Sequence, residues 1–189
     1  MGGMRRFSMH GERDSILRGS MSGKKTGVLF VCTGNICRSP TAEAVFRKLA
    51  ADAGVGETIL ADSAGTHAYH VGEPPDPRAL AAAAKRGYDL SSLRARRFER
   101  ADFQRFELIL AMDSDHYSIL SRMAQPSGGH RLKLMMSYAR RFSEQDVPDP
   151  YYGGPQGFER VLDMLEDAAQ GLLESLRKAE IPGFPLSRE

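Results

Sequence analysis

Short apolar runs that alternate with helical patterns are the feature that most constrains the fold of this chain. Residues 27–31 (GVLFV) form a continuous apolar run, which is typical of a strand buried on both faces of a parallel sheet. Similar runs at 58–61, 107–112 and 131–136 predict three more strands. Because strands and helices alternate, the sequence predicts an α/β fold, a four-stranded parallel sheet with helices on both faces.

Helical spacing and end signals locate the helices. A Ser-Pro pair at 39–40 predicts an N-cap and a first-turn proline for a helix that ends near Gly54. A second helix is expected at 77–85, and Asp113 is expected to cap a third that ends at about residue 123. The apolar face of a long final helix comprises Phe158, Val161, Leu162, Leu165, Ala168, Ala169, Leu172, Leu173 and Leu176.

Length and composition predict one soluble domain. The chain has 189 residues, of which 41% are hydrophobic and 26% charged, and these values are near the average for soluble proteins. No apolar run approaches the ~18 residues of a membrane helix, and a net charge of +2 gives no reason to expect a nucleic-acid partner. We therefore expect neither a membrane nor a nucleic acid as a partner.

The amino-terminal segment differs from the rest. Residues 1–25 hold six Lys or Arg against two acids, with no apolar stretch and no cleavage pattern of a signal peptide. We expect a disordered tail or a non-native extension at 1–25 and a single domain at 26–189. The chain has two cysteines, both in one short loop, so a reducing cytoplasm is the expected location.

The stretch VCTGNICRSP, at 31–40, joins the first strand to the first helix. Cys32 faces the amino end of that helix, where unpaired N–H groups and the helix dipole favour a thiolate. Gly34 lets successive backbone N–H groups converge on a tetrahedral oxyanion, and Arg38 adds a planar fork for two phosphate oxygens. This phosphate-binding loop suits attack by sulfur on a phosphate monoester. The alternative is that Cys32 is a buried structural thiol.

Several motifs together resemble one family. VLFVCTGNICRSPTAEAVFR is similar to the signature of the low-molecular-weight protein tyrosine phosphatases, and DSAG, HVGEPPDPRA, GYDLS, RAR, LAMD and VPDPYYGG follow in the family's order. The resemblance covers about residues 26–178. It implies that the single domain is a phosphatase domain that hydrolyses phosphotyrosine in proteins through a phosphocysteine intermediate, with no metal and no other cofactor.

The resemblance implies a role for each matched residue. Cys32 is matched to the nucleophile, Arg38 to the phosphate clamp and Ser39 to the hydroxyl that supports the thiolate. Asn35 is matched to the residue that braces the loop, and Asp149 to the general acid that protonates the leaving phenolate and then activates water.

The sequence around Asp149 agrees with a loop that reaches over the site. Pro148 and Pro150 flank it, and Pro150 holds Asp149 in an extended conformation. From the residues alone, a helix cap or a turn is an equal alternative for Asp149.

The substrate slot is also expected from the resemblance. Tyr69, Tyr151 and Tyr152 are matched to its aromatic walls, and tyrosines beside the site can stack on a phenyl ring. The loop residues that complete the binding site are Thr33, Gly34, Asn35, Ile36, Cys37 and Ser39. Members that act on phosphoarginine tend to carry threonine where this chain has Ile36, so Ile36 favours phosphotyrosine.

The second cysteine suggests redox regulation. A sulfenic acid on Cys32 could condense with Cys37 to a disulfide, which would protect Cys32 from irreversible oxidation. The alternative for Cys37 is a small residue packed behind the loop.

Four further positions complete the expectations. His67 and His70 lie three residues apart without a ligand-rich cluster around them, so no metal site is expected. The family often has a histidine that supports the loop where this chain has Leu93, which leaves the bracing of the loop open. Asp113, in LAMD, is matched to structural support only.

Two other functions compete with phosphatase activity. An arsenate reductase would use the same loop, but its chemistry needs a third cysteine, which this chain lacks. A non-catalytic phosphate-binding module would need neither Cys32 nor Asp149. The sequence carries no indication of oligomeric state.

Overall fold

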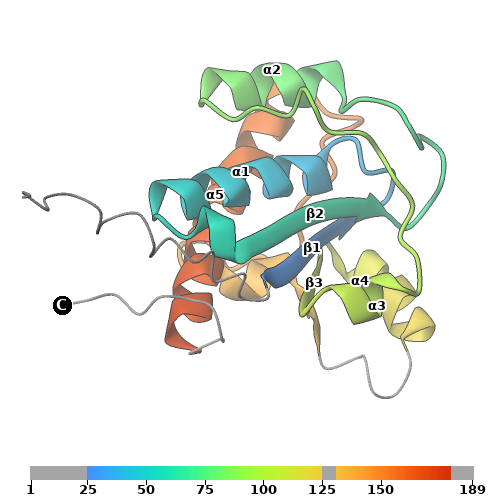
Figure 1. Ribbon diagram of the computed structural model, residues 1–189. Coiled ribbons are helices and arrows are strands. Elements are labelled where there is room, and N and C mark those ends of the chain that lie inside the picture. Colours follow the sequence, from blue (N-terminus) through green and yellow to red (C-terminus); the bar gives the residue numbers. More distant parts are fainter. Residues whose placement is uncertain (1–24, 125–130, 180–189) are drawn as a thin grey trace, which may run out of the picture.

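The computed structural model describes residues 25–124 and 131–179, which form one parallel sheet with helices packed on it (Figure 1). The sheet has four strands in the order β2-β1-β3-β4, and every neighbouring pair is parallel. The strands are β1 (Thr26–Cys32), β2 (Ile59–Gly65), β3 (Leu108–Ala111) and β4 (Leu132–Leu134). The predicted α/β class and parallel four-stranded sheet are confirmed.

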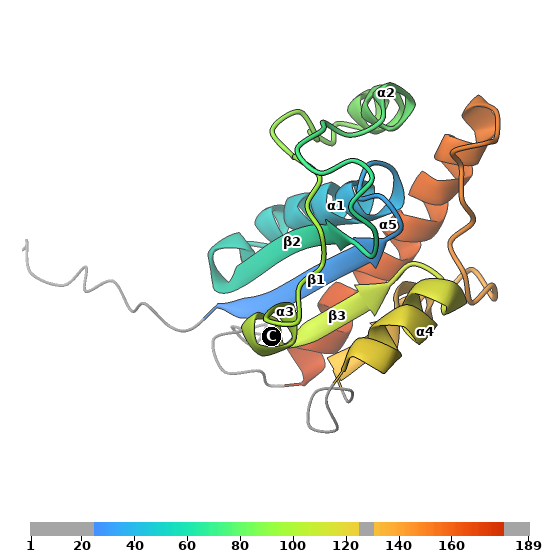
Figure 2. The same cartoon turned by 90° about the vertical axis from the view of Figure 1, so that its right-hand side faces the viewer.

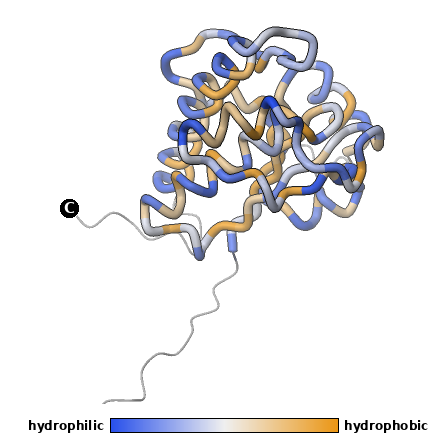
Figure 3. Tube along the Cα trace, turned by 90° about the horizontal axis from the view of Figure 1, so that it is seen from above, coloured by the Kyte–Doolittle hydropathy of each residue, from blue (hydrophilic) through white to orange (hydrophobic). Residues whose placement is uncertain are grey.

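Helices cover both faces of the sheet (Figure 2). They are α1 (Arg38–Asp52), α2 (Pro77–Lys85), α3 (Asp102–Arg105), α4 (Ser114–Met123) and α5 (Pro155–Lys178), with 3₁₀ turns η1 (Gly56–Thr58) and η3 (Met135–Tyr138). Helices α1 and α5 pack on one face, whereas α4 and the segment that includes α3 lie on the other. Along the helices, hydrophobic and hydrophilic stretches follow one another, as expected for amphipathic helices (Figure 3).

The unbroken apolar run at 27–31 lies in β1, an internal strand of the sheet. Val28 and Phe30 enter the core shared with α1 and α5, and Leu29 and Val31 enter the opposite core. All four side chains are fully buried. A strand covered on both faces has no polar side, so its sequence does not alternate. Because β1 is central, the loop that leaves its carboxyl end lies in the middle of one edge of the sheet.

Several predicted boundaries shift in the structure. Strand β2 extends to Gly65, beyond the predicted 58–61, because it pairs with β1 along its whole length. Strand β4 ends at Leu134, where the predicted strand was expected to continue. The two residues that follow, Met135 and Met136, are buried as well, but in a 3₁₀ turn. An apolar run alone does not distinguish these two conformations.

The predicted cap of the first helix is wrong. Helix α1 begins at Arg38, with Cys37 in the N-cap position and no side-chain cap hydrogen bond. Ser39 lies inside the helix, and its hydroxyl is used by the thiol of Cys32. By contrast, the cap at Asp113 is confirmed, since its carboxylate accepts a hydrogen bond from the His116 N–H.

The termini are only partly described. Of the predicted tail at 1–25 only Lys25 is described, and the last ten residues of the predicted domain at 26–189 also lie outside the described ranges. Within those ranges, no helix is both long and apolar enough to cross a bilayer.

Candidate active site

The loop between β1 and α1 holds the predicted nucleophile. Cys32 is the last residue of β1 and is 3% exposed, and its Sγ lies 3.0 Å from the Ser39 Oγ. The first turn of α1 follows directly, so unpaired N–H groups and the helix dipole are directed at this end of the strand. The structure therefore places the Cys32 thiol beside a hydroxyl and at a helix amino terminus.

Asn35 fixes the shape of the loop. It has a φ of 58°, and among the described residues it alone adopts a positive φ without being glycine. Its Nδ2 donates to the Oγ atoms of Ser39 and Ser63, each at 2.9 Å, and its Oδ1 accepts from the Arg96 N–H at 2.9 Å. Asparagine tolerates this conformation better than most residues, and three hydrogen bonds hold it there. They join the loop to β2 and to the segment that follows α2.

Glu43 ends this hydrogen-bond network on the α1 side. The Ser63 hydroxyl donates to Glu43 Oε2 at 2.6 Å, and Arg47 pairs with the other oxygen at 2.7 Å. Burial raises the pKa of Glu43, and the Ser63 hydrogen bond and Arg47 oppose that rise. Leu93, at the position of the expected histidine, packs instead in a small apolar cluster with Leu90. The network is therefore complete without a histidine.

The guanidinium of Arg38 is held by acids on both sides. Its Nη1 donates to Asp113 Oδ2 at 2.7 Å and to the Val147 carbonyl at 3.1 Å, and its Nη2 donates to Asp149 Oδ2 at 3.1 Å. Arg38 is only 4% exposed. A buried guanidinium with fixed partners is pre-oriented for an incoming anion, because little side-chain freedom is left to lose.

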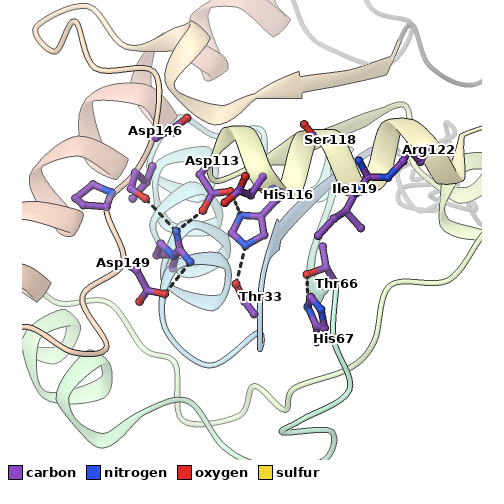
Figure 4. A pocket seen from close by; sticks show the side chains of 14 residues that line it. Thr33, Thr66, His67, Asp113, His116, Ser118, Ile119, Arg122, Asp146 and Asp149 are labelled. Atoms are coloured by element: carbon purple, nitrogen blue, oxygen red, sulfur yellow. Dashed lines mark hydrogen bonds and ion pairs between the residues drawn. The ribbon is translucent and has the colours of Figure 1, made fainter.

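His116 connects Asp113 back to the loop (Figure 4). Its Nε2 lies 2.8 Å from Thr33 Oγ1, and its Nδ1 lies 2.7 Å from Asp113 Oδ1 in an ion-pair contact that lacks hydrogen-bond geometry. Although burial raises the pKa of Asp113, the contacts of its carboxylate with the His116 ring and backbone N–H and the charges of His116 and Arg38 lower it to about 2. Asp113 therefore stays ionised beside Arg38.

His116 was not among the site residues predicted from the sequence. Its position three residues after a predicted N-cap was the only available signal, and that spacing is common to the first turn of any capped helix.

A cavity of about 260 Å³ opens above the thiol. It is lined by Cys32, Thr33, Gly34, Ile36, Cys37, Arg38, Tyr69, His70, Asp149, Tyr151 and Tyr152. All predicted catalytic and binding residues line it except Asn35 and Ser39, which lie behind the loop, and His70 is an addition. A Cβ at Gly34 would come 2.8 Å from the His70 ring, so a larger residue there would require the imidazole to shift.

The tyrosines form the rim of this cavity. Tyr152 is 92% exposed and Tyr69 is 71% exposed, and the ring of Tyr151 contacts that of Tyr152 edge-on at 5.0 Å. Such exposed rings can hold a planar aromatic guest without first giving up packing inside the protein.

Cys37 is a free thiol in the same loop. It is 6% exposed and lies in the main core cluster. Burial raises the pKa of Cys37 to about 12, and the charges of Asp76, Cys32 and Asp149 act in the same direction. Cys37 is therefore a protonated, weakly nucleophilic thiol in the reduced protein.

Comparisons with known proteins agree with this geometry. A sequence model of the family described as low molecular weight phosphotyrosine protein phosphatase matches residues 27–181. The chain belongs to this family. A low molecular weight protein-tyrosine-phosphatase of Streptomyces coelicolor is 49% identical over 154 residues, which cover 80% of this chain and 93% of that protein. The human low molecular weight phosphotyrosine protein phosphatase is 39% identical over 149 residues, which cover 78% of this chain and 93% of that protein.

A solved structure shows the same fold. The crystal structure of a protein tyrosine phosphatase from Entamoeba histolytica, with Hepes in its active site, matches with a TM-score of 0.81 and 39% identity over 83% of this chain and 100% of that one. The low molecular weight phosphatase family consists of hydrolases, and its recognition from the sequence is confirmed.

Proposed function

We propose that this low molecular weight phosphatase hydrolyses phosphotyrosine in proteins through a phosphocysteine on Cys32. One observation carries the proposal. The Cys32 thiol lies in a pocket that also contains the buried guanidinium of Arg38, the carboxylate of Asp149 and a rim of tyrosines. A nucleophile, an anion clamp and a proton donor within one pocket are what a two-step transfer of a phosphoryl group requires.

In the first step the Cys32 thiolate attacks phosphorus. The S–P bond forms as the P–O bond to the tyrosine breaks, and the leaving phenolate takes a proton from Asp149. Before substrate binds, Asp149 accepts hydrogen bonds from Arg38 and from the Tyr151 N–H at 2.9 Å. When Arg38 turns to the phosphoryl oxygens, Asp149 is released from one of these donors, and the negative charge of the dianion favours its protonation.

In the second step water attacks the phosphocysteine. Asp149, now ionised, takes a proton from that water, the S–P bond breaks, and inorganic phosphate leaves with the thiolate restored. The Ser39 Oγ, 3.0 Å from the Cys32 Sγ, stabilises the negative charge on sulfur as it returns. The loop amides and Arg38 hold the equatorial oxygens in both steps.

Turnover of para-nitrophenyl phosphate and of a phosphotyrosine peptide tests this mechanism. We expect Cys32→Ser to abolish turnover of both. Asp149→Ala should lower kcat/KM by about 10²-fold or more for the peptide, and by less for the nitrophenyl ester, whose leaving group needs little protonation. Turnover by folded Cys32→Ser would refute the mechanism.

We also propose that the chain acts in the cytoplasm and is protected by reversible oxidation. Peroxide would convert the Cys32 thiolate to a sulfenic acid with loss of water or hydroxide, and condensation with the Cys37 thiol would form a disulfide and release water. Mapping of disulfides after peroxide treatment tests this. A disulfide that dithiothreitol reduces, with recovery of activity, is expected in the wild type, and irreversible loss is expected in Cys37→Ser. Equal recovery in both proteins would refute it.

A further inference from the structure

A second cavity, of about 790 Å³, lies beside the catalytic pocket (Figure 4). The two share three lining residues, Thr33, Arg38 and Asp149. The mechanism above does not use the second cavity. The catalytic pocket has room for a phosphate and its ring, so a protein substrate must place the rest of its chain elsewhere. The second cavity is about three times as large as the catalytic pocket.

One wall of the second cavity is a face of α4. Asp115, Ile119 and Arg122 line it and lie four and three residues apart, which places them along one side of the helix. At a rise of 1.5 Å per residue, the seven steps from Asp115 to Arg122 span about 10 Å. This is the length of about three residues of extended peptide at roughly 3.3 Å each.

The two ends of this wall carry opposite charge. Asp115 lies at the amino end of α4, and Asp146, which also lines the cavity, accepts from the N–H and hydroxyl of the preceding residue, Ser114. Arg122 lies at the other end, and His67 lines the cavity as well. Within the described ranges, neither Asp115 nor Arg122 has a charged partner, so both groups are available to a ligand.

Stacked rings connect the second cavity to the substrate slot. Tyr69 lines the catalytic pocket and His67 lines the second cavity, and their rings stack with centroids 5.0 Å apart and planes 13° apart. Thr66 contacts the His67 Nδ1 at 2.9 Å, which fixes the orientation of that imidazole. These stacked rings therefore form part of the boundary between the substrate slot and the second cavity.

We propose that the second cavity is the subsite for the substrate residues that flank the phosphotyrosine. It takes a lysine or arginine at the Asp115 and Asp146 end, close to the phosphotyrosine, and an acidic residue about three positions farther on, next to Arg122 and His67. This inference rests on the proposed function, because it assigns the substrate class of the same active site: phosphopeptides with a basic residue about two positions from the phosphotyrosine and an acidic one about three positions beyond it.

Four phosphotyrosine peptides test the proposal. One pair carries lysine two residues from the phosphotyrosine and glutamate three residues beyond, on either its amino or its carboxyl side, and the other pair has lysine and glutamate exchanged. Each kcat/KM is divided by the same enzyme's kcat/KM for para-nitrophenyl phosphate, which has no flanking residues. We expect the matched order to be preferred about three- to tenfold on one of the two sides, the scale of one or two exposed charge contacts.

Charge reversal supplies the decisive variants. Asp115→Lys and Arg122→Glu should each remove the preference, and the double variant should reverse it in favour of the exchanged order. The matched controls are Glu99→Lys and Arg100→Glu, adjacent exposed charges that line neither cavity, and both should keep the wild-type preference. Titration of the peptides into each variant in a Cys32→Ser background should give the same ratios in Kd.

The outcomes separate this inference from the proposed function. If the wild type hydrolyses all four peptides equally, or if the preference survives in the double variant, the subsite is wrong while the phosphatase mechanism stands. If no phosphotyrosine peptide is hydrolysed, the proposed function itself fails.

Discussion

Replacement of Asp113 by asparagine tests the electrostatic core of the site. Asparagine caps a helix about as well as aspartate, so Asp113→Asn keeps the hydrogen bond from the His116 N–H and removes only the charge that faces Arg38 and His116. In the folded protein the pKa of Asp113 falls from 3.8 to about 2. The side chain is 20% exposed, so solvent screens these contacts only in part.

The size of the effect follows from that shift. At 1.36 kcal/mol for each pKa unit, the ionised carboxylate of Asp113 stabilises the fold by about 2 kcal/mol. Because the folded pKa is lower than the unfolded one, this contribution is present in full above about pH 4 and disappears as the pH falls towards 2. Asp113→Asn lacks the charge at every pH, so its deficit against the wild type should shrink over the same range.

Urea unfolding at a series of pH values measures this difference. We expect the free energy of unfolding of Asp113→Asn to be about 2 kcal/mol below that of the wild type at pH 7, with unchanged m-values, and the two proteins to converge between pH 4 and pH 2. Glu99→Gln, which removes an exposed carboxylate, is the control and should follow the wild type. A deficit that is absent at pH 7, or that stays constant down to pH 2.5, would refute the reasoning.

Three other substitutions have definite expected outcomes. Ser63→Ala removes one hydrogen-bond partner from Asn35 and one from Glu43, and should cost about 1–3 kcal/mol of unfolding free energy in urea and lower kcat as the loop loosens; unchanged stability and kcat would contradict the network. Gly65→Ala places a Cβ 2.7 Å from a backbone oxygen in the phosphate-binding loop, so the inhibition constant of phosphate should rise severalfold, whereas unaltered inhibition would show that the loop is not sterically fixed. Gly171→Ala, on α5, drives a Cβ into the carbonyl oxygen of η3 and should lower stability by about 1–3 kcal/mol with KM retained; a wild-type melting temperature would count against this packing.

The sequence was sufficient for the sheet because its signals are local. A strand buried on two faces requires an unbroken apolar run, as in β1, and a long amphipathic helix such as α5 repeats its pattern over many turns. Short elements lack such repetition. Helix α3 has four residues and η1 has three, so neither was predicted.

The candidate site was predictable where it lies within one loop. Cys32, Gly34 and Arg38 are close in sequence, and the chemistry of a strand, a turn and a helix start determines their roles. Contacts between distant segments were not predictable. His116 reaches Thr33 across 83 residues, and Glu43 reaches Ser63 across 20 residues. Both depend on the packing of α4 and α1 against the sheet, which no local pattern encodes.

The same limit explains the wrong cap. Serine is a residue type that often caps helices, but the hydroxyl of Ser39 contacts the Cys32 thiol and accepts a hydrogen bond from Asn35. A polar side chain that a tertiary site requires is not available for the local role that its type suggests.

Capture of the covalent intermediate tests the account most directly. Asp149→Ala is mixed with para-nitrophenyl phosphate, quenched with acid within milliseconds and digested, and the phosphorylated peptide is identified by mass spectrometry. Because nitrophenolate leaves without a proton while water attack still needs the base, the intermediate should accumulate with its phosphoryl group on Cys32. The account would be contradicted if a burst of nitrophenol were released while the phosphoryl group was found on another residue or on none.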